Sequence, residues 1–102
     1  MIGIVAKIRV KEGHGPQFEN VDKQLVEAVN ANEPDCLLYA LHRAQEDENL
    51  YVFMEQYKDQ AATEFHRKQD HFRTLGRAMG EFMDGPVEIM RLDGVCARSA
   101  LA

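Results

Sequence analysis

The chain of 102 residues predicts an α+β fold of the ferredoxin-like type, with the element order β-α-β-β-α-β. Two patterns carry this prediction. Four segments alternate in hydropathy with the period of a strand, and the segments between them repeat apolar residues at the spacing of a helix. In such a fold both helices cover one face of a four-stranded antiparallel sheet, and the other face stays open.

The first strand is expected at Met1–Val10, where every even-numbered residue is apolar and the odd-numbered residues form a mixed face. A glycine-rich turn ends it. Pro16 then fits the first turn of a helix, where no backbone N–H is needed. An apolar stripe that includes Phe18 and Leu25 continues this helix up to the turn formers around Pro34.

Strands two and three are expected at Cys36–Ala44 and Leu50–Tyr57, joined by a polar connection of the hairpin type. Asp59 is a suitable N-cap for a helix that runs to about Lys68. Asp70 is expected to cap a second segment with an apolar stripe through Phe72, Leu75, Met79 and Phe82. The fourth strand is expected at Val87–Leu92. Residues 1–94 thus form one domain, and residues 95–102 form a tail whose role the sequence does not define.

The two faces of the predicted sheet differ in composition. The uniformly apolar face of the first strand is expected to meet the helices, and the mixed side chains are then assigned to the open face. These are Val5, Lys7, Tyr51, Phe53, Glu55 and Tyr57. Pairing the open faces of two copies would bury them around a cavity, and a chain this short gains stability from a partner. We therefore expect a homodimer.

Composition excludes several classes of function. The formal net charge is −5 and the basic residues are scattered, so we expect no nucleic-acid partner. No apolar run reaches the length of a membrane span and no signal sequence opens the chain, so we expect a cytoplasmic protein with no membrane partner. The spacing of Cys36 and Cys96 fits no CxxC metal site, and no glycine motif of a nucleotide or flavin site is present. We expect neither a metal nor a cofactor.

One stretch brings together side chains suited to proton transfer. Residues 55–72 read EQYKDQAATEFHRKQDHF, in which Glu55 lies near the end of a strand and His66 and His71 follow on helical sequence. Two shorter pieces upstream complete the pattern, Glu33-Pro34-Asp35-Cys36 and Leu41-His42-Arg43. The pattern resembles the antibiotic biosynthesis monooxygenase (ABM) family over roughly residues 2–94. The resemblance implies a dimeric α+β barrel. The family includes cofactor-independent oxygenases of quinols and polyketides, so the resemblance also implies an activity of this kind.

Glu55, His66 and His71 are the candidate catalytic residues. A buried carboxylate has a raised pKa, and a histidine titrates near neutral pH. The family places a histidine of its motif at His66. His71 joins the site if the helix breaks between Lys68 and Asp70, because it lies about 140° from His66 on a continuous helix. The candidate substrate-binding side chains lie on the second and third strands: Tyr39, Arg43, Tyr51, Phe53 and Tyr57.

The predicted face assignment places Glu55 on the open face and His66 in the helix layer. The two side chains then meet only if His66 reaches the rim of the sheet or the face assignment is inverted. We expect a shared pocket at the sheet rim. Each residue also has a structural interpretation, as an ion pair for Glu55 and as a partner of a backbone carbonyl for His66.

The expected function is cofactor-independent monooxygenation of a quinol or another electron-rich aromatic small molecule. Two alternatives remain. The pieces Tyr57-Lys58-Asp59 and Phe65-His66 are similar to the phospho-autoinducer-2 isomerases, which implies proton transfer on a phosphorylated hydroxydione. That reaction needs a cation such as Arg43 or Lys7 for the phosphate. The second alternative is a non-catalytic barrel that binds a small molecule.

Overall fold

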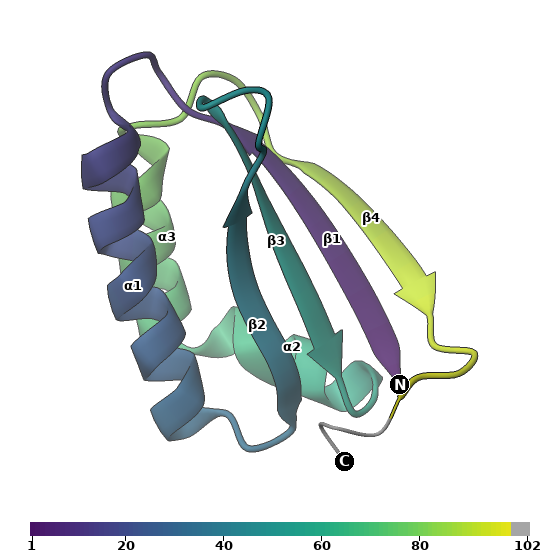
Figure 1. Ribbon diagram of the computed structural model, residues 1–102. Coiled ribbons are helices and arrows are strands. Elements are labelled where there is room, and N and C mark those ends of the chain that lie inside the picture. Colours follow the sequence, from purple (N-terminus) through teal and green to yellow (C-terminus); the bar gives the residue numbers. More distant parts are fainter. Residues whose placement is uncertain (99–102) are drawn as a thin grey trace.

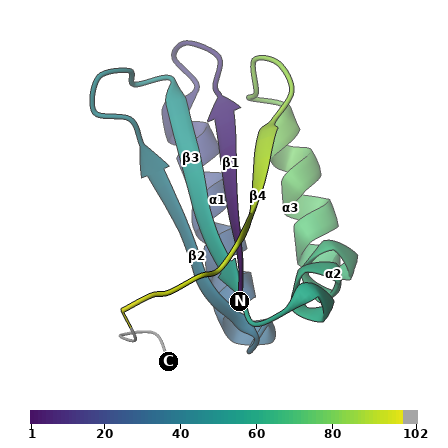
Figure 2. The same ribbon diagram turned by 90° about the vertical axis from the view of Figure 1, so that its right-hand side faces the viewer.

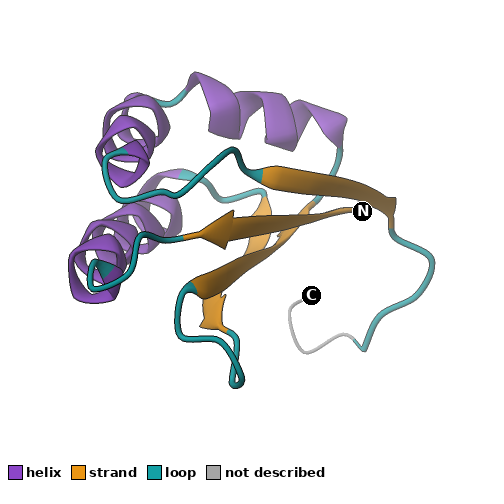
Figure 3. Cartoon of the chain, turned by 90° about the horizontal axis from the view of Figure 1, so that it is seen from above, coloured by secondary structure: helices purple, strands orange, loops and turns teal. Residues whose placement is uncertain are grey.

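The protein has a ferredoxin-like α+β fold, described for residues 1–98 in a computed structural model (Figure 1). Its elements are β1 (Ile2–Arg9), α1 (Gly15–Asn32), β2 (Cys36–Arg43), β3 (Leu50–Tyr57), α2 (Gln60–Lys68), α3 (Asp70–Gly80) and β4 (Glu88–Asp93). The strands form one antiparallel sheet in the order β2-β3-β1-β4. The helices lie together on one side of it (Figure 3). Within residues 1–98, no helix has the length and apolar character of a membrane span.

The break in the second helical region is confirmed. Asp59 caps α2, since its Oδ1 accepts a hydrogen bond from the backbone N–H of Ala62 at 2.9 Å. The helix ends at Lys68 because Gln69 adopts an extended backbone with φ −72° and ψ 141°. The prediction that Asp70 caps α3 is wrong: Gln69 occupies the cap position and Asp70 is the first helical residue. The carboxylate of Asp70 still lies at the positive end of the helix dipole.

Other boundaries differ from the prediction by one or two residues. β2 ends at Arg43 and β4 begins at Glu88. Phe82 lies beyond the end of α3, so its apolar side chain packs against the core from the following turn. Helix ends are weakly encoded because the last turn has few backbone partners.

The predicted division of the sheet faces is correct for β1 and wrong for β3. Ile4 of β1 lies directly opposite Glu55 of β3, and Ala6 lies opposite Phe53. Residues opposite each other in an antiparallel pair point to the same side of the sheet. Glu55 and its aromatic neighbours therefore face the helices, together with the apolar residues of β1. Alternation along one strand cannot reveal this, because it does not define the register between strands.

The core lies between this face and α1. Its fully buried members include Phe18 and Leu25 from α1, and Ile8 and Tyr51 from the sheet. The phenol ring of Tyr51 packs against the ring of Phe18 at 4.9 Å between centroids. The aromatic residues of β3 are in the core because they bury the largest apolar area.

The opposite face of the sheet carries no helix (Figure 2). Val5 and Lys7 of β1 lie on it, paired across the ladder with Met54 and Val52. Met54 is 44% exposed, and Met90 of β4 is 58% exposed. This open face thus exposes apolar side chains to solvent in the single chain, beside charged ones such as Lys7.

Candidate active site

A cavity of about 470 Å³ lies between the helix-covered side of the sheet and helices α2 and α3. Its walls are mainly apolar and come from all four strands and from helices α2 and α3. They include Ile4, Ala6, Ile8, Phe53, Phe72, Met79 and Ile89. The polar groups are few: Tyr39, Glu55, His66 and three arginines. Its size and lining are those of a small-molecule site.

Glu55 lies on the sheet wall of this cavity and is buried. The hydroxyl of Tyr57 donates a hydrogen bond to its Oε1 at 2.6 Å. Burial raises the pKa of Glu55 to about 7, although the hydrogen bond from Tyr57 and the charge of Arg91 oppose the shift. Near neutral pH the carboxyl group is therefore poised between its charged and neutral forms.

His66 lies on the helix wall of the same cavity and is also buried. Its Nδ1 is 2.8 Å and 3.0 Å from the two carboxylate oxygens of Glu33. Burial lowers the pKa of His66 more than the charge of Glu33 raises it, so the ring is neutral at pH 7. Nδ1–H then donates to Glu33, and Nε2 carries the free lone pair.

Aromatic rings surround the imidazole of His66. Its centroid lies 4.6 Å from that of Phe72, 5.1 Å from Tyr39 and 5.6 Å from Tyr57. The rings restrict the orientation of the imidazole and keep water away from it. A dry imidazole in a fixed orientation is suited to proton transfer.

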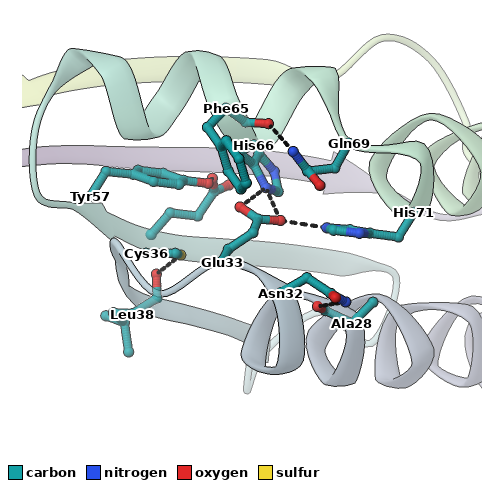
Figure 4. A network of polar contacts seen from close by, with 11 residues as sticks. Ala28, Asn32, Glu33, Cys36, Leu38, Tyr57, Phe65, His66, Gln69 and His71 are labelled. Atoms are coloured by element: carbon teal, nitrogen blue, oxygen red, sulfur yellow. Dashed lines mark hydrogen bonds and ion pairs between the residues drawn. The ribbon is translucent and has the colours of Figure 1, made fainter.

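Glu33 joins three parts of the chain at this site (Figure 4). It lies between α1 and β2, with its side chain almost completely buried. Besides His66 on α2 it binds His71 on α3, whose Nε2 is 2.5 Å from Oε2. The break at Gln69 allows both histidines to reach one carboxylate.

The structure brings four of the predicted site residues together and places the others elsewhere. Glu55, His66, Tyr39 and Phe53 line the cavity. Glu55 and His66 thus share a pocket. They do so because Glu55 faces the helices, and not because His66 reaches around the rim of the sheet. His71 binds Glu33 and does not line the cavity.

Three other predicted residues lie outside the cavity. Tyr57 is fully buried behind Glu55 and orients its carboxyl group. Tyr51 and Arg43 lie in a separate groove between α1 and β2, where both bind Glu19, at 2.6 Å and 3.1 Å.

Sequence reasoning gave no role to Glu33, Arg67, Arg73 or Arg91. Glu33 was visible as part of the Glu-Pro-Asp-Cys piece, but nothing local indicates that a glutamate at a helix end is buried. Arg67 and Arg73 each follow an aromatic ring of the site, His66 and Phe72. In the part of the chain that the structure describes, no group of three or more His, Cys, Asp or Glu side chains has the arrangement of a metal site.

Comparisons with known proteins agree with this fold. Residues 1–78 match the family described as Antibiotic biosynthesis monooxygenase. The chain is 30% identical to "Putative monooxygenase YcnE" of Bacillus subtilis (strain 168), over 91% of this chain and 97% of that protein.

Two solved structures are similar over most of their length. One is a "putative antibiotic biosynthesis monooxygenase" from Caulobacter crescentus CB15, with 39% identity and a TM-score of 0.89 over 92% of this chain and 89% of that one. The other is PA3566 from Pseudomonas aeruginosa, with 30% identity and a TM-score of 0.81 over 93% and 94%. The fold, the matched motif region and these relatives show that the chain belongs to the antibiotic biosynthesis monooxygenase family.

Proposed function

We propose that the protein is a cofactor-independent monooxygenase of an electron-rich aromatic small molecule such as a quinol. The observation that carries the proposal is the cavity itself. It places a carboxyl group with a pKa of about 7 and a neutral imidazole between apolar and aromatic walls. The family assignment supports the reaction class.

The chemistry needs a base and a dry site. Removing a phenolic proton turns a quinol into a strong one-electron donor to oxygen. The resulting ring radical and superoxide combine at a ring carbon, and loss of water leaves a hydroxyquinone. One quinol and one O₂ give one hydroxyquinone and one water, so no external reductant is consumed.

Each polar side chain has a distinct role in this proposal. Glu55 in its charged form takes the phenolic proton, since its pKa lies near that of an efficient base at neutral pH. Nε2 of His66 accepts a hydrogen bond from a second hydroxyl of the substrate. Glu33 is a positioning residue that holds His66 in the tautomer with the proton on Nδ1.

The isomerase alternative has less support from the comparisons, because the matched family and the curated relative are both described as monooxygenases. Lys7 lies on the open face of the sheet, and Arg43 lies in the groove beside Glu19. Neither of these cations lines the cavity that contains Glu55, but Arg67, Arg73 and Arg91 do, so the cations do not distinguish the two reactions.

The test is oxygen uptake in the presence of a panel of hydroquinones. We expect uptake to rise with pH through about 7, because Glu55 must lose its proton to act as the base. Glu55→Gln is expected to lower the rate by about a hundredfold or more and to remove this pH dependence, as loss of a general base does. Glu64→Gln changes an exposed carboxyl group on α2 and serves as the matched control.

Glu33→Gln tests the positioning role separately. It is expected to lower the rate and to keep a pH dependence from Glu55, which shifts to lower pH because the charge of Glu33 contributes to the raised pKa of Glu55. If no hydroquinone gives uptake that Glu55→Gln removes, the proposed function is wrong.

A further inference from the structure

The cavity has a charge opposite to that of the whole protein. Its charged lining residues are one carboxylate, Glu55, and three arginines, Arg67, Arg73 and Arg91. The lining therefore carries +2 when Glu55 is ionised, from three positive charges and one negative. The chain as a whole has a formal charge of −5. Such a local reversal attracts an anion to the cavity.

The three arginines come from three different elements. Arg91 on β4 lies in the same row across the sheet as Glu55, with Ile4 of β1 between them. Two strand spacings separate these positions, about 10 Å. Arg67 follows His66 on α2, and Arg73 lies on α3. The cavity that holds Glu55 and His66 is thus bordered by arginine residues from α2, α3 and β4.

The arginines have few partners within the chain. Arg73 forms an exposed ion pair with Asp70, which contributes little stability. Among residues 1–98, neither Arg67 nor Arg91 forms an ion pair with a carboxylate. Solvated arginines that only cover apolar walls are the alternative explanation. That explanation does not account for three of them around one cavity of an acidic protein.

We infer that the substrate is an aromatic ring system that carries an anionic oxygen group, held by Arg67 and Arg91 with Arg73 nearby, while the ring lies between the apolar walls. A guanidinium group binds an oxyanion through two parallel N–H donors, which fixes orientation as well as affinity. The anion would position the ring so that its hydroxyl groups reach Glu55 and His66. This inference rests on the proposed function for the ring chemistry, but the binding of the anion is measured independently.

The first experiment compares two ligands that differ only in the anion. Dissociation constants of naphthohydroquinone and naphthohydroquinone carboxylate are measured by calorimetry under argon, where no oxygen is consumed. We expect the carboxylate to bind about tenfold more tightly at low ionic strength, as a charge-assisted hydrogen bond provides. The preference should weaken as salt is added. A phosphate ester of the same ring shows which oxyanion fits better.

Variants then locate the anion. Arg67→Gln and Arg91→Gln are each expected to remove most of the preference for the carboxylate and to leave the affinity for the neutral ring nearly unchanged. Arg77→Gln is the matched control, because Arg77 lies one turn beyond Arg73 on α3 and does not line the cavity. Equal binding of the two ligands, no binding of the carboxylate, or an equal loss of both ligands in the arginine variants overturns the inference.

The two proposals fail in different ways. One outcome is a preference for the carboxylate that depends on Arg67 and Arg91, with no oxygen uptake. This outcome refutes the proposed monooxygenase activity and supports the anion site. Oxygen uptake that depends on Glu55, with equal affinity for both ligands, keeps the monooxygenase and refutes the anion site.

Discussion

At the scale of single residues, Asp22 has a carboxyl group whose burial opposes its ionisation. It lies on the inner side of α1 and is completely buried, and neither carboxyl oxygen has a hydrogen-bond partner within residues 1–98. Burial, and secondarily the charge of Glu19, raises its pKa to about 8. At neutral pH the folded protein therefore holds this carboxyl group mainly in its neutral form.

The raised pKa predicts how stability depends on pH. The folded state binds the Asp22 proton up to about pH 8, whereas the unfolded chain releases it near the ordinary pKa of an aspartate, 3.8. The folded protein therefore loses stability, roughly a few kcal/mol, as pH rises through this range. Asp22→Asn does not titrate, so its melting temperature relative to the wild type should rise between pH 5 and pH 8, within the range that these pKa values span.

Thermal denaturation across a pH series measures this difference. Glu27→Gln, an exposed change on the same helix, should give a difference independent of pH. A constant difference for Asp22→Asn as well would show that the carboxyl group is already charged in the folded protein.

Among the elements, the short helix α2 has most influence on the site, because it carries His66 between a cap at Asp59 and a break at Gln69. The cap satisfies a free N–H of the first turn, and the break lets α3 change direction so that His71 also reaches Glu33. Nine residues are too few for a helix to be stable alone, so α2 depends on its ends and its packing.

Removing the cap should therefore destabilise the protein. Asp59→Ala is expected to lower the free energy of unfolding by about 1 kcal/mol, since an unsatisfied N–H remains in the first turn. Asp59→Asn retains a capping oxygen and should stay near the wild type. Urea denaturation followed by circular dichroism compares the two. Equal stability of the alanine and asparagine variants would mean that the hydrogen bond to Ala62 contributes nothing.

At the scale of the whole molecule, the open face of the sheet has no helix over it and exposes Met54 and Met90 (Figure 2). Contiguous apolar surface of this kind is typical of an interface. The corrected face assignment changes what a partner subunit covers. A partner subunit on this face would cover Val5, Met54 and Met90, and not Glu55, which lies beneath the helices of its own chain.

We predict a homodimer formed through this face, with more than about 1,200 Å² of total buried surface, as stable specific interfaces have. Met54→Glu places a charge in the contact and should shift the protein toward the monomer in sedimentation velocity. Phe65→Glu is the control, because Phe65 is exposed to a similar extent but lies on α2. A wild-type protein that sediments as a monomer at micromolar concentration, or a dimer that Phe65→Glu disrupts and Met54→Glu does not, contradicts this interface.

The sequence by itself determined the order of the elements, the cap at Asp59 and the break before Asp70, because these depend on near neighbours along the chain. It also indicated Glu55 and His66 and the family to which the chain belongs. Hydropathy periods, cap residues and short motifs are local signals, and each is readable from a few consecutive residues.

Only the tertiary structure decided which sheet face holds Glu55, because the pairing of Ile4 with Glu55 joins residues far apart in the chain. The same is true of Glu33, which becomes a partner of His66 and His71 only when α1, α2 and α3 converge. Arg91 lines the cavity only because β4 pairs with β1 in the register that places Arg91 opposite Ile4. Register and burial are sums over many long-range contacts, so no single stretch of sequence contains them.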